Sequence, residues 1–301
     1  MLMIPPRAVL VGLLSLAACG AAAPGEVVVH EAPEGAPRHA GYRVSLRVAD
    51  EPWREVFVYD AVVGEAGRDH MGFVSFDADF VEPVELRVVP TRKVQRVRVR
   101  PGHREIEHRF DGQAVHLTID RARQLSVEFD DELMNNLAVF ANPLEDDPIT
   151  EARPGVRYFG PGVHKVGGDG RGALHPEAGE TIYIAGGAIV YGRIDTGGKD
   201  DITIRGRGIL AGTRFPHDRQ QHRPQMVYVG NARNVRLKGI TLLDAPGWNV
   251  HLHQVSDVVV RNVKIIAWMP ETDGINPRGA QEVLIADCFI RTGDDCISIN
   301  R

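Results

Sequence analysis

The chain has 301 residues, a formal net charge of −5 and a hydrophobic content of 43%. That length and apolar content are enough for about two packed domains. The negative charge argues against nucleic acid or an anionic membrane surface as the main partner.

The N-terminal residues predict export. Arg7 precedes an apolar run, Ala8 to Ala18, which is too short to span a bilayer and has the layout of a secretory signal. The run leads into Leu-Ala-Ala-Cys, which resembles a bacterial lipobox, so residues 1–19 are expected to be a lipoprotein signal with Cys19 lipidated after cleavage. An ordinary signal peptide with an incidental cysteine is the alternative. The expected location is the outer membrane, facing the periplasm or the cell surface.

Residues 20–40 are rich in Ala, Pro, Gly and Glu and indicate a tether. Residues 41–145 then contain short alternating runs separated by turn signals, which predict a small β-sandwich. The runs are Tyr42–Val48, Glu55–Tyr59, Phe73–Phe76, Val84–Val89, Val94–Val99, Val115–Ile119 and Leu125–Phe129. Alternating arginines at 96, 98 and 100 could contact an acidic glycan, but we favour the solvated side of an edge strand. The proline-containing segment 142–156 is expected to be a linker.

A short motif recurs in residues 155–301. It reads polar, apolar, any, apolar, any, then a small or turn-forming residue, and it starts at residues 201, 234, 257 and 282. A looser copy starts at Thr181, and a polar loop, residues 212–225, lengthens the first interval. Short alternating units at a nearly constant period favour a stacked parallel β-helix over a second sandwich. The fold class is therefore predicted to be all-β, a sandwich followed by coils.

Two cysteines fall in the last predicted coil. Cys288 and Cys296 could form a disulfide in an exported protein, or could be small inward-facing residues of the core. The sequence leaves both interpretations open.

Three aspartates indicate acid–base chemistry. Asp294 and Asp295 follow Asp273 by about 21 residues, roughly one coil, so the three carboxylates should meet on one face of the solenoid. Clustered carboxylates shift one another's pKa, as acid–base cleavage of a sugar bond requires. The alternative is a set of solvated turn aspartates. Because Ile297 and Ile299 should point inward, the last strand is expected to begin after Asp295, which leaves Asp294 and Asp295 in the cleft.

From about residue 158 to residue 301 the chain resembles glycoside hydrolase family 28, the polygalacturonase-type right-handed β-helices. Thr272-Asp273-Gly274 matches the end of the family's Asn-Thr-Asp-Gly motif, and Gly293-Asp294-Asp295 matches its second acidic motif. Arg223-Pro224 and the segment Pro246 to His251 are also similar to family sequences. The resemblance implies inverting hydrolysis, with Asp294 as the general acid and Asp273 and Asp295 as the base that activates water.

The sequence also departs from the family. Glu271 stands where the family has Asn, and the family's later Gly-His-Gly and Arg-x-Lys motifs do not occur before residue 301, so we expect a chain truncated at its C-terminus. The candidate substrate-binding residues are Glu271, Trp248, His251, Arg278 and Arg291, with Trp268 a further ring that could stack on a sugar.

The expected function is hydrolysis of a pectin-like polysaccharide by an exported monomer, with no cofactor and no nucleic-acid partner. His251 and His253 face one side without a third ligand, so no metal is expected. Three alternatives stay open. They are a dextranase-type glycanase, which the preceding sandwich favours, a calcium-dependent polysaccharide lyase, and a non-catalytic glycan-binding surface protein.

Overall fold

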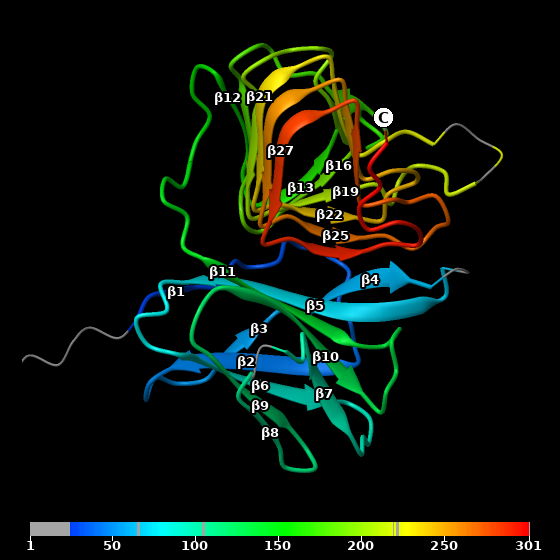
Figure 1. Ribbon diagram of the computed structural model, residues 1–301. Helices are drawn as coiled ribbons and strands as arrows, with labels where there is room; N and C mark the ends of the chain where they lie inside the picture. Colours follow the sequence, from blue (N-terminus) through cyan, green and yellow to red (C-terminus); the bar gives the residue numbers. More distant parts are fainter. Residues whose placement is uncertain (1–24, 65–66, 104–105, 219, 221–222, 301) are drawn as a thin grey trace, which may run out of the picture.

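A computed structural model describes residues 25–64, 67–103, 106–218, 220 and 223–300. Cys19 and the predicted signal lie outside these residues. Every regular element in the described ranges is a β-strand, and they form a sandwich of two sheets below a stack of parallel coils (Figure 1). No helix in these ranges is long and apolar enough to cross a membrane. The all-β prediction, with a right-handed parallel β-helix, is confirmed.

Two sheets form the sandwich. The first has the order β1 (Val27–Val28), β5 (Asp69–Ala78), β11 (Leu137–Pro143), β10 (Arg123–Phe129) and β7 (Val97–Arg100), with β4 (Tyr59–Val63) also paired to β5. The second has the order β3 (Arg54–Val56), β2 (Tyr42–Val48), β6 (Val84–Pro90), β9 (Val115–Ile119) and β8 (His108–Phe110). Alternate side chains of both sheets fill one shared core, as expected for half-buried strands.

Two details of the sandwich bear on the sequence predictions. The arginine stripe lies on β7, at the edge of its sheet, and Arg96 and Arg98 pair with Asp131 at the surface, so the edge-strand interpretation is confirmed. The expected tether needs correction in its described part. β1 pairs with β5, and His39 donates its backbone N–H to the Val58 carbonyl, so residues that follow the signal pack on the sandwich rather than hang free.

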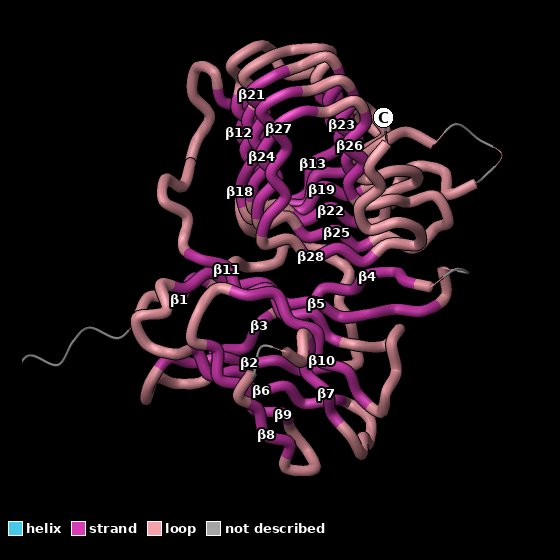
Figure 2. Tube along the Cα trace, viewed as in Figure 1, coloured by secondary structure: helices cyan, strands magenta, loops and turns pink. Residues whose placement is uncertain are grey.

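Each of the first five coils contributes one strand to each of three parallel sheets, and the last coil contributes a strand to the first two (Figure 2). The first sheet contains β12 (Val156–Phe159), β15 (Thr181–Ile184), β18 (Thr203–Gly206), β21 (Arg233–Lys238), β24 (Ser256–Arg261) and β27 (Gln281–Ala286). The second contains β13 (Gly162–Lys165), β16 (Ala188–Tyr191), β19 (Ile209–Ala211), β22 (Thr241–Leu243), β25 (Lys264–Ile266) and β28 (Phe289–Arg291). The third contains β14 (Ala173–Leu174), β17 (Arg193–Asp195), β20 (Val227–Gly230), β23 (Val250–His253) and β26 (Ile275–Arg278).

The polar residue that opens each repeat has a backbone role. Asp201, Asn234, Asp257 and Glu282 all have positive φ, between 52° and 61°. Asp and Asn adopt this left-handed conformation at lower cost than other non-glycine residues, because their short side chains bond locally. The side chains also stack from coil to coil, since Asn234 donates to Asp201 at 2.6 Å. The repeat therefore marks the corner at which the chain enters the first coil sheet.

The sandwich and the coils share a hydrophobic interface. Phe73 and Phe140, on the outer face of the first sandwich sheet, pack against Ile209, Ile266 and Phe289 on the outer face of the second coil sheet. β5 and β11 are therefore covered on both faces, which explains their nearly continuous burial. The predicted linker also packs on the coils, because Ile149 is buried against Tyr183.

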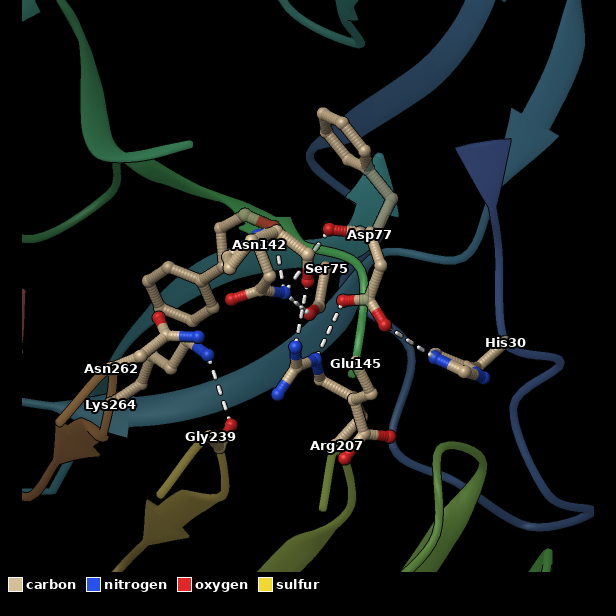
Figure 3. A network of polar contacts seen from close by, with 12 residues as sticks. His30, Ser75, Asp77, Asn142, Glu145, Arg207, Gly239, Asn262 and Lys264 are labelled. Carbon is tan, nitrogen blue, oxygen red and sulfur yellow. Dashed lines mark hydrogen bonds and ion pairs between the residues drawn. The ribbon is translucent and has the colours of Figure 1, made fainter. Parts of the chain in front are cut away.

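A buried polar network crosses the same interface (Figure 3). Arg207 of the coils binds Asp77 of the sandwich at 2.8 Å and donates to the Pro143 carbonyl at 2.7 Å. Burial alone would raise the pKa of Asp77, but His30 and Arg207 outweigh it and hold this pKa below its usual value. Lys264 lies nearby, 1% exposed, and donates to the Gly239 carbonyl at 3.0 Å.

Candidate active site

The acidic residues lie on one type of turn. In every coil the chain passes from the second coil sheet to the third, and in the last two coils this turn carries Asp273, then Asp294 and Asp295. After the second acidic turn, Ile297 bridges Ile275 in parallel and Gly274 donates to the Asp295 carbonyl at 2.9 Å. Only isolated bridges, at Ile297 and Asn300, follow Asp295, and Ile297 and Ile299 are exposed, so the described residues do not form the expected strand with inward-facing isoleucines. The bridge register sets Asp295 on the coil next to Asp273.

Asp273 is the buried member of the cluster, with 8% exposure. Asn276, on β26, donates to its Oδ2 at 2.6 Å and is itself buried. Burial raises the pKa of Asp273 above its ordinary value, and the charges of Asp294 and Asp295 raise it further against the Asn276 hydrogen bond. Asp273 therefore holds a proton more readily than an isolated aspartate does.

Asp294 has the opposite surroundings. It is exposed, and its two carboxylate oxygens accept backbone hydrogen bonds from Glu271 at 3.1 Å and from Asp295 at 3.0 Å. Asp295 is also exposed. A buried carboxyl group whose pKa is raised thus lies beside two accessible carboxyl groups.

Gly274 and Gly293 allow the two turns to approach closely. A Cβ on Gly293 would collide with the carbonyls of Trp268 and Met269, and one on Gly274 would collide with the Cys296 carbonyl. Only glycine accommodates such a backbone contact. The two glycines of the acidic motifs therefore fix the spacing between successive acidic turns.

The outer face of the third coil sheet lies beside Asp273. Tyr228, His251 and Asn276 stand in register on β20, β23 and β26. Trp248 meets His251 edge-to-face with ring centroids 4.8 Å apart, so this tryptophan is half-buried packing at the site. Burial, followed by the charges of His253 and Arg278, lowers the pKa of His251 to about 4. His251 is thus a neutral imidazole, and neither ring nitrogen has a hydrogen-bond partner among the described residues.

Glu271 is tied to a residue of the long loop. Arg223 forms an ion pair with the Glu271 carboxylate and donates to the Pro270 carbonyl at 3.0 Å. Glu271 itself has a φ of 63°. This arrangement holds the peptide N–H of Glu271 toward Asp294, so Glu271 contributes through its backbone as well as its side chain.

Trp268 belongs to a packed unit and is not a free stacking platform. Its Nε1 donates to the buried Asp244 carboxylate at 2.6 Å, and its ring stacks on His217 at 5.7 Å. His217 contacts the same carboxylate at 3.1 Å, which raises the pKa of His217 although burial opposes the shift. Gly67, beyond β4, packs against the other side of the unit.

The two arginines that were predicted to bind substrate, Arg278 and Arg291, lie in different surroundings. Arg278 is exposed and stands in register above His253, next to the imidazole pair. Arg291 is directed instead at the sandwich, where it donates to the Leu133 carbonyl at 2.7 Å and to Asn136 at 3.3 Å. We therefore reassign Arg291 from substrate binding to the contact between the sandwich and the coils. Cys288 and Cys296 are both free, so the two thiols are not paired.

The sequence analysis missed three contributors, Asn276, Asn249 and Asp244. Asn249 is fully buried and donates to the Asp273 carbonyl at 3.0 Å from the previous coil. Asn276 could have been found, because it lies three residues after Asp273, on the strand that follows the acidic turn. Asp244 gives no sequence signal, since its partners lie 24 and 27 residues away.

Comparison with known proteins agrees with this geometry. Residues 175–301 match the model of the glycosyl hydrolases family 28. A probable polygalacturonase of Vitis vinifera is 34% identical over 103 residues, which cover 33% of this chain and 21% of that protein. One from Arabidopsis thaliana is 40% identical over 80 residues, 26% of this chain and 18% of that protein. The coil region of this chain is therefore similar to the glycosyl hydrolases family 28.

The matched region spans only about a fifth of the length of these relatives. Among solved structures, Dex49A from Penicillium minioluteum superimposes with a TM-score of 0.60 at 14% identity, covering 88% of this chain and 67% of that one. A likeness over 88% of the chain includes both the sandwich and the coils. At this level of identity it bears on the fold alone.

Proposed function

We propose that the protein is an exported glycoside hydrolase that cleaves a pectin-like polysaccharide with inversion. One observation carries the proposal. Asp273 is buried and its pKa is raised above the ordinary value, while Asp294 and Asp295 on the next coil are accessible. Paired carboxyl groups in different environments are what acid–base cleavage of a glycosidic bond needs. The match of residues 175–301 to the family 28 model supports the same reaction class.

In the proposed reaction one carboxylic acid gives its proton to the leaving glycosidic oxygen. A carboxylate on the opposite side takes a proton from water as that water attacks the anomeric carbon. The family resemblance gives the acid role to Asp294. Burial raises the pKa of Asp273, which makes Asp273 the other candidate for the acid role. Both assignments use the same three aspartates. They differ in which variant, Asp273→Asn or Asp294→Asn, should keep activity on a substrate whose leaving group needs no proton.

The test compares Asp273→Asn and Asp294→Asn on polygalacturonate and on an aryl glycoside of the same sugar. Reducing-sugar release from the polymer should fall at least about 100-fold in both variants, given the usual size of acid–base catalysis. Only the variant that lacks the general acid should retain activity on the aryl glycoside, because its leaving group departs without a proton. Asp287→Asn, an exposed turn residue of the same coil, is the matched control. Full polymer activity in both site variants would refute the proposal.

The product separates hydrolysis from elimination. Hydrolysis yields saturated reducing ends, whereas a polysaccharide lyase yields an ultraviolet-absorbing double bond and loses activity with a chelator. A parallel assay on a neutral α-glucan tests the dextranase-type alternative. Tight binding without turnover of any polymer would favour a glycan-binding protein.

We further propose export with lipidation at Cys19, which the lipobox-like sequence at residues 16–19 supports. Cys19→Ser should abolish incorporation of labelled fatty acid and release the protein from membranes. Unchanged membrane association of this variant would refute the anchor.

A further inference from the structure

A cavity of about 470 Å³ lies between the sandwich and the coils, and none of its lining residues belongs to the candidate active site. Arg123 and Gln124, at the start of β10, line the sandwich side. Asn262 and Cys288, on successive coil corners, line the other side. The volume falls within the range of about 300 to 1,000 Å³ that small-molecule sites occupy.

Two residues that line the cavity carry buried polar atoms without a hydrogen-bond partner. Gln124 Nε2 donates to Asn262 Oδ1 at 2.7 Å, but Gln124 Oε1 is buried with no partner in the described parts of the chain. The Arg123 side chain is 8% exposed, and its Nε likewise has no partner there. Leaving a buried polar atom without a partner costs free energy. A ligand that reaches these atoms after a small side-chain rotation recovers that free energy.

The charges favour a neutral ligand. Arg123 pairs with Asp120 at 2.5 Å, and Arg261 at the rim pairs with Asp287 at 3.8 Å. Each guanidinium group thus already has a carboxylate partner, although Arg123 shares Asp120 with Arg121. The unused atoms are one donor, Arg123 Nε, and one acceptor, Gln124 Oε1, and a hydroxyl group serves both whereas a carboxylate serves only the donor.

The apolar part of the lining suits the same ligand. Pro101 and Pro143 supply flat aliphatic surface beside the polar groups. A sugar ring presents hydroxyls at its edge and C–H groups on its face. We propose that this cavity is a second carbohydrate-binding site, which takes a neutral mono- or disaccharide unit. Binding in this cavity is independent of the proposed hydrolysis.

Cys288 provides a reporter inside the cavity, and Cys296 provides an internal control. Cleavage after arginine puts them in separate peptides, residues 279–291 and 292–301. The full chain is alkylated with iodoacetamide at alkaline pH, with maltose, with lactose, with galacturonate or without sugar, and both peptides are quantified by mass spectrometry. We expect a neutral disaccharide to slow the labelling of Cys288 at least threefold and to leave Cys296 unchanged.

Variants establish that the protection arises in the cavity. Arg123→Lys and Gln124→Met should abolish it, whereas Arg121→Lys, which changes the exposed neighbour that also pairs with Asp120, should retain it. No protection by either disaccharide, equal protection of both cysteines, or protection that persists in both cavity variants would overturn the site. Stronger protection by galacturonate would overturn the ligand class.

A second measurement covers the case in which Cys288 does not react without sugar. The same disaccharides should then raise the thermal unfolding midpoint of the wild type and of Arg121→Lys, but not that of Arg123→Lys. An equal rise in all three proteins, or none, rejects the site. Asp294→Asn should bind as the wild type does, so failure of the hydrolase proposal and failure of this one are distinguishable.

Discussion

Replacing Lys264 by Met should stabilise the protein at neutral pH. Burial lowers the pKa of Lys264 from 10.5 to about 7. Each pKa unit corresponds to about 1.4 kcal/mol, so burying the charged form costs roughly 5 kcal/mol of unfolding free energy. Methionine fills the space but leaves the Gly239 carbonyl without this donor, at about 1–3 kcal/mol. The expected net gain is about 2–4 kcal/mol below pH 7.

The sign of the pH dependence follows from the same pKa. Between about pH 7 and 10.5 the unfolded chain keeps the proton that folded Lys264 has lost, so wild-type stability rises with pH across this window. The advantage of Lys264→Met should therefore shrink as the pH rises, reach zero between about pH 8 and 10, and become a loss of about 1–3 kcal/mol above pH 10.5, where only the missing hydrogen bond counts. Titrating tyrosines affect both proteins equally, so the difference between the two isolates Lys264.

Urea unfolding followed by tryptophan fluorescence at several pH values measures this difference. Lys238→Met, at an exposed position, is the matched control and should show no pH-dependent gain. A Lys264→Met variant that is less stable than wild type at neutral pH, or a difference that does not change with pH, would refute the reasoning.

Three further predictions concern the coils. Asn276→Ala removes a hydrogen bond that lowers the pKa of Asp273, so the pH limb of kcat/KM that reports Asp273 should move to higher pH; an unmoved limb contradicts this role. Gly293→Ala should lower kcat by about 100-fold with an unchanged circular dichroism spectrum, because the added methyl displaces the acidic turn; retained activity would show that the turn is tolerant. Asn234→Val should lower the unfolding free energy by about 1–2 kcal/mol more than Asn234→Gly in urea, because a β-branched residue resists positive φ; equal stability of the two rejects the strain.

The coil repeat is the part of the fold that the sequence predicted best. The segments that begin at residues 181, 201, 234, 257 and 282 supply five successive strands of one parallel sheet. The reason is local, because alternation sets the inward side chains and a residue suited to positive φ sets each corner. The loop at residues 212–225 also lies where the long interval placed it, between β19 and β20.

Strands that are buried on both faces, such as β5, were harder to predict from the sequence. The sequence analysis gave Phe73–Phe76 as a strand, but the observed β5 runs from Asp69 to Ala78. Both faces of β5 are covered, one by the sandwich core and one by the coils, so its alternation is weak at the edges. Likewise β1 lies in the segment that we predicted to be a tether, and its pairing with β5 joins residues that are far apart in the sequence.

The candidate site, like the fold, was predictable from the sequence only in part. The sequence by itself determined which acids are present and that one coil separates them, since the motifs and the period are local properties. Only the tertiary structure decided that Asp273 is buried with Asn276, that backbone N–H groups hold Asp294, and that Arg291 turns to the sandwich. Burial and hydrogen bonding depend on neighbours from other coils and from the other domain, and these set the proton affinity of each carboxyl group.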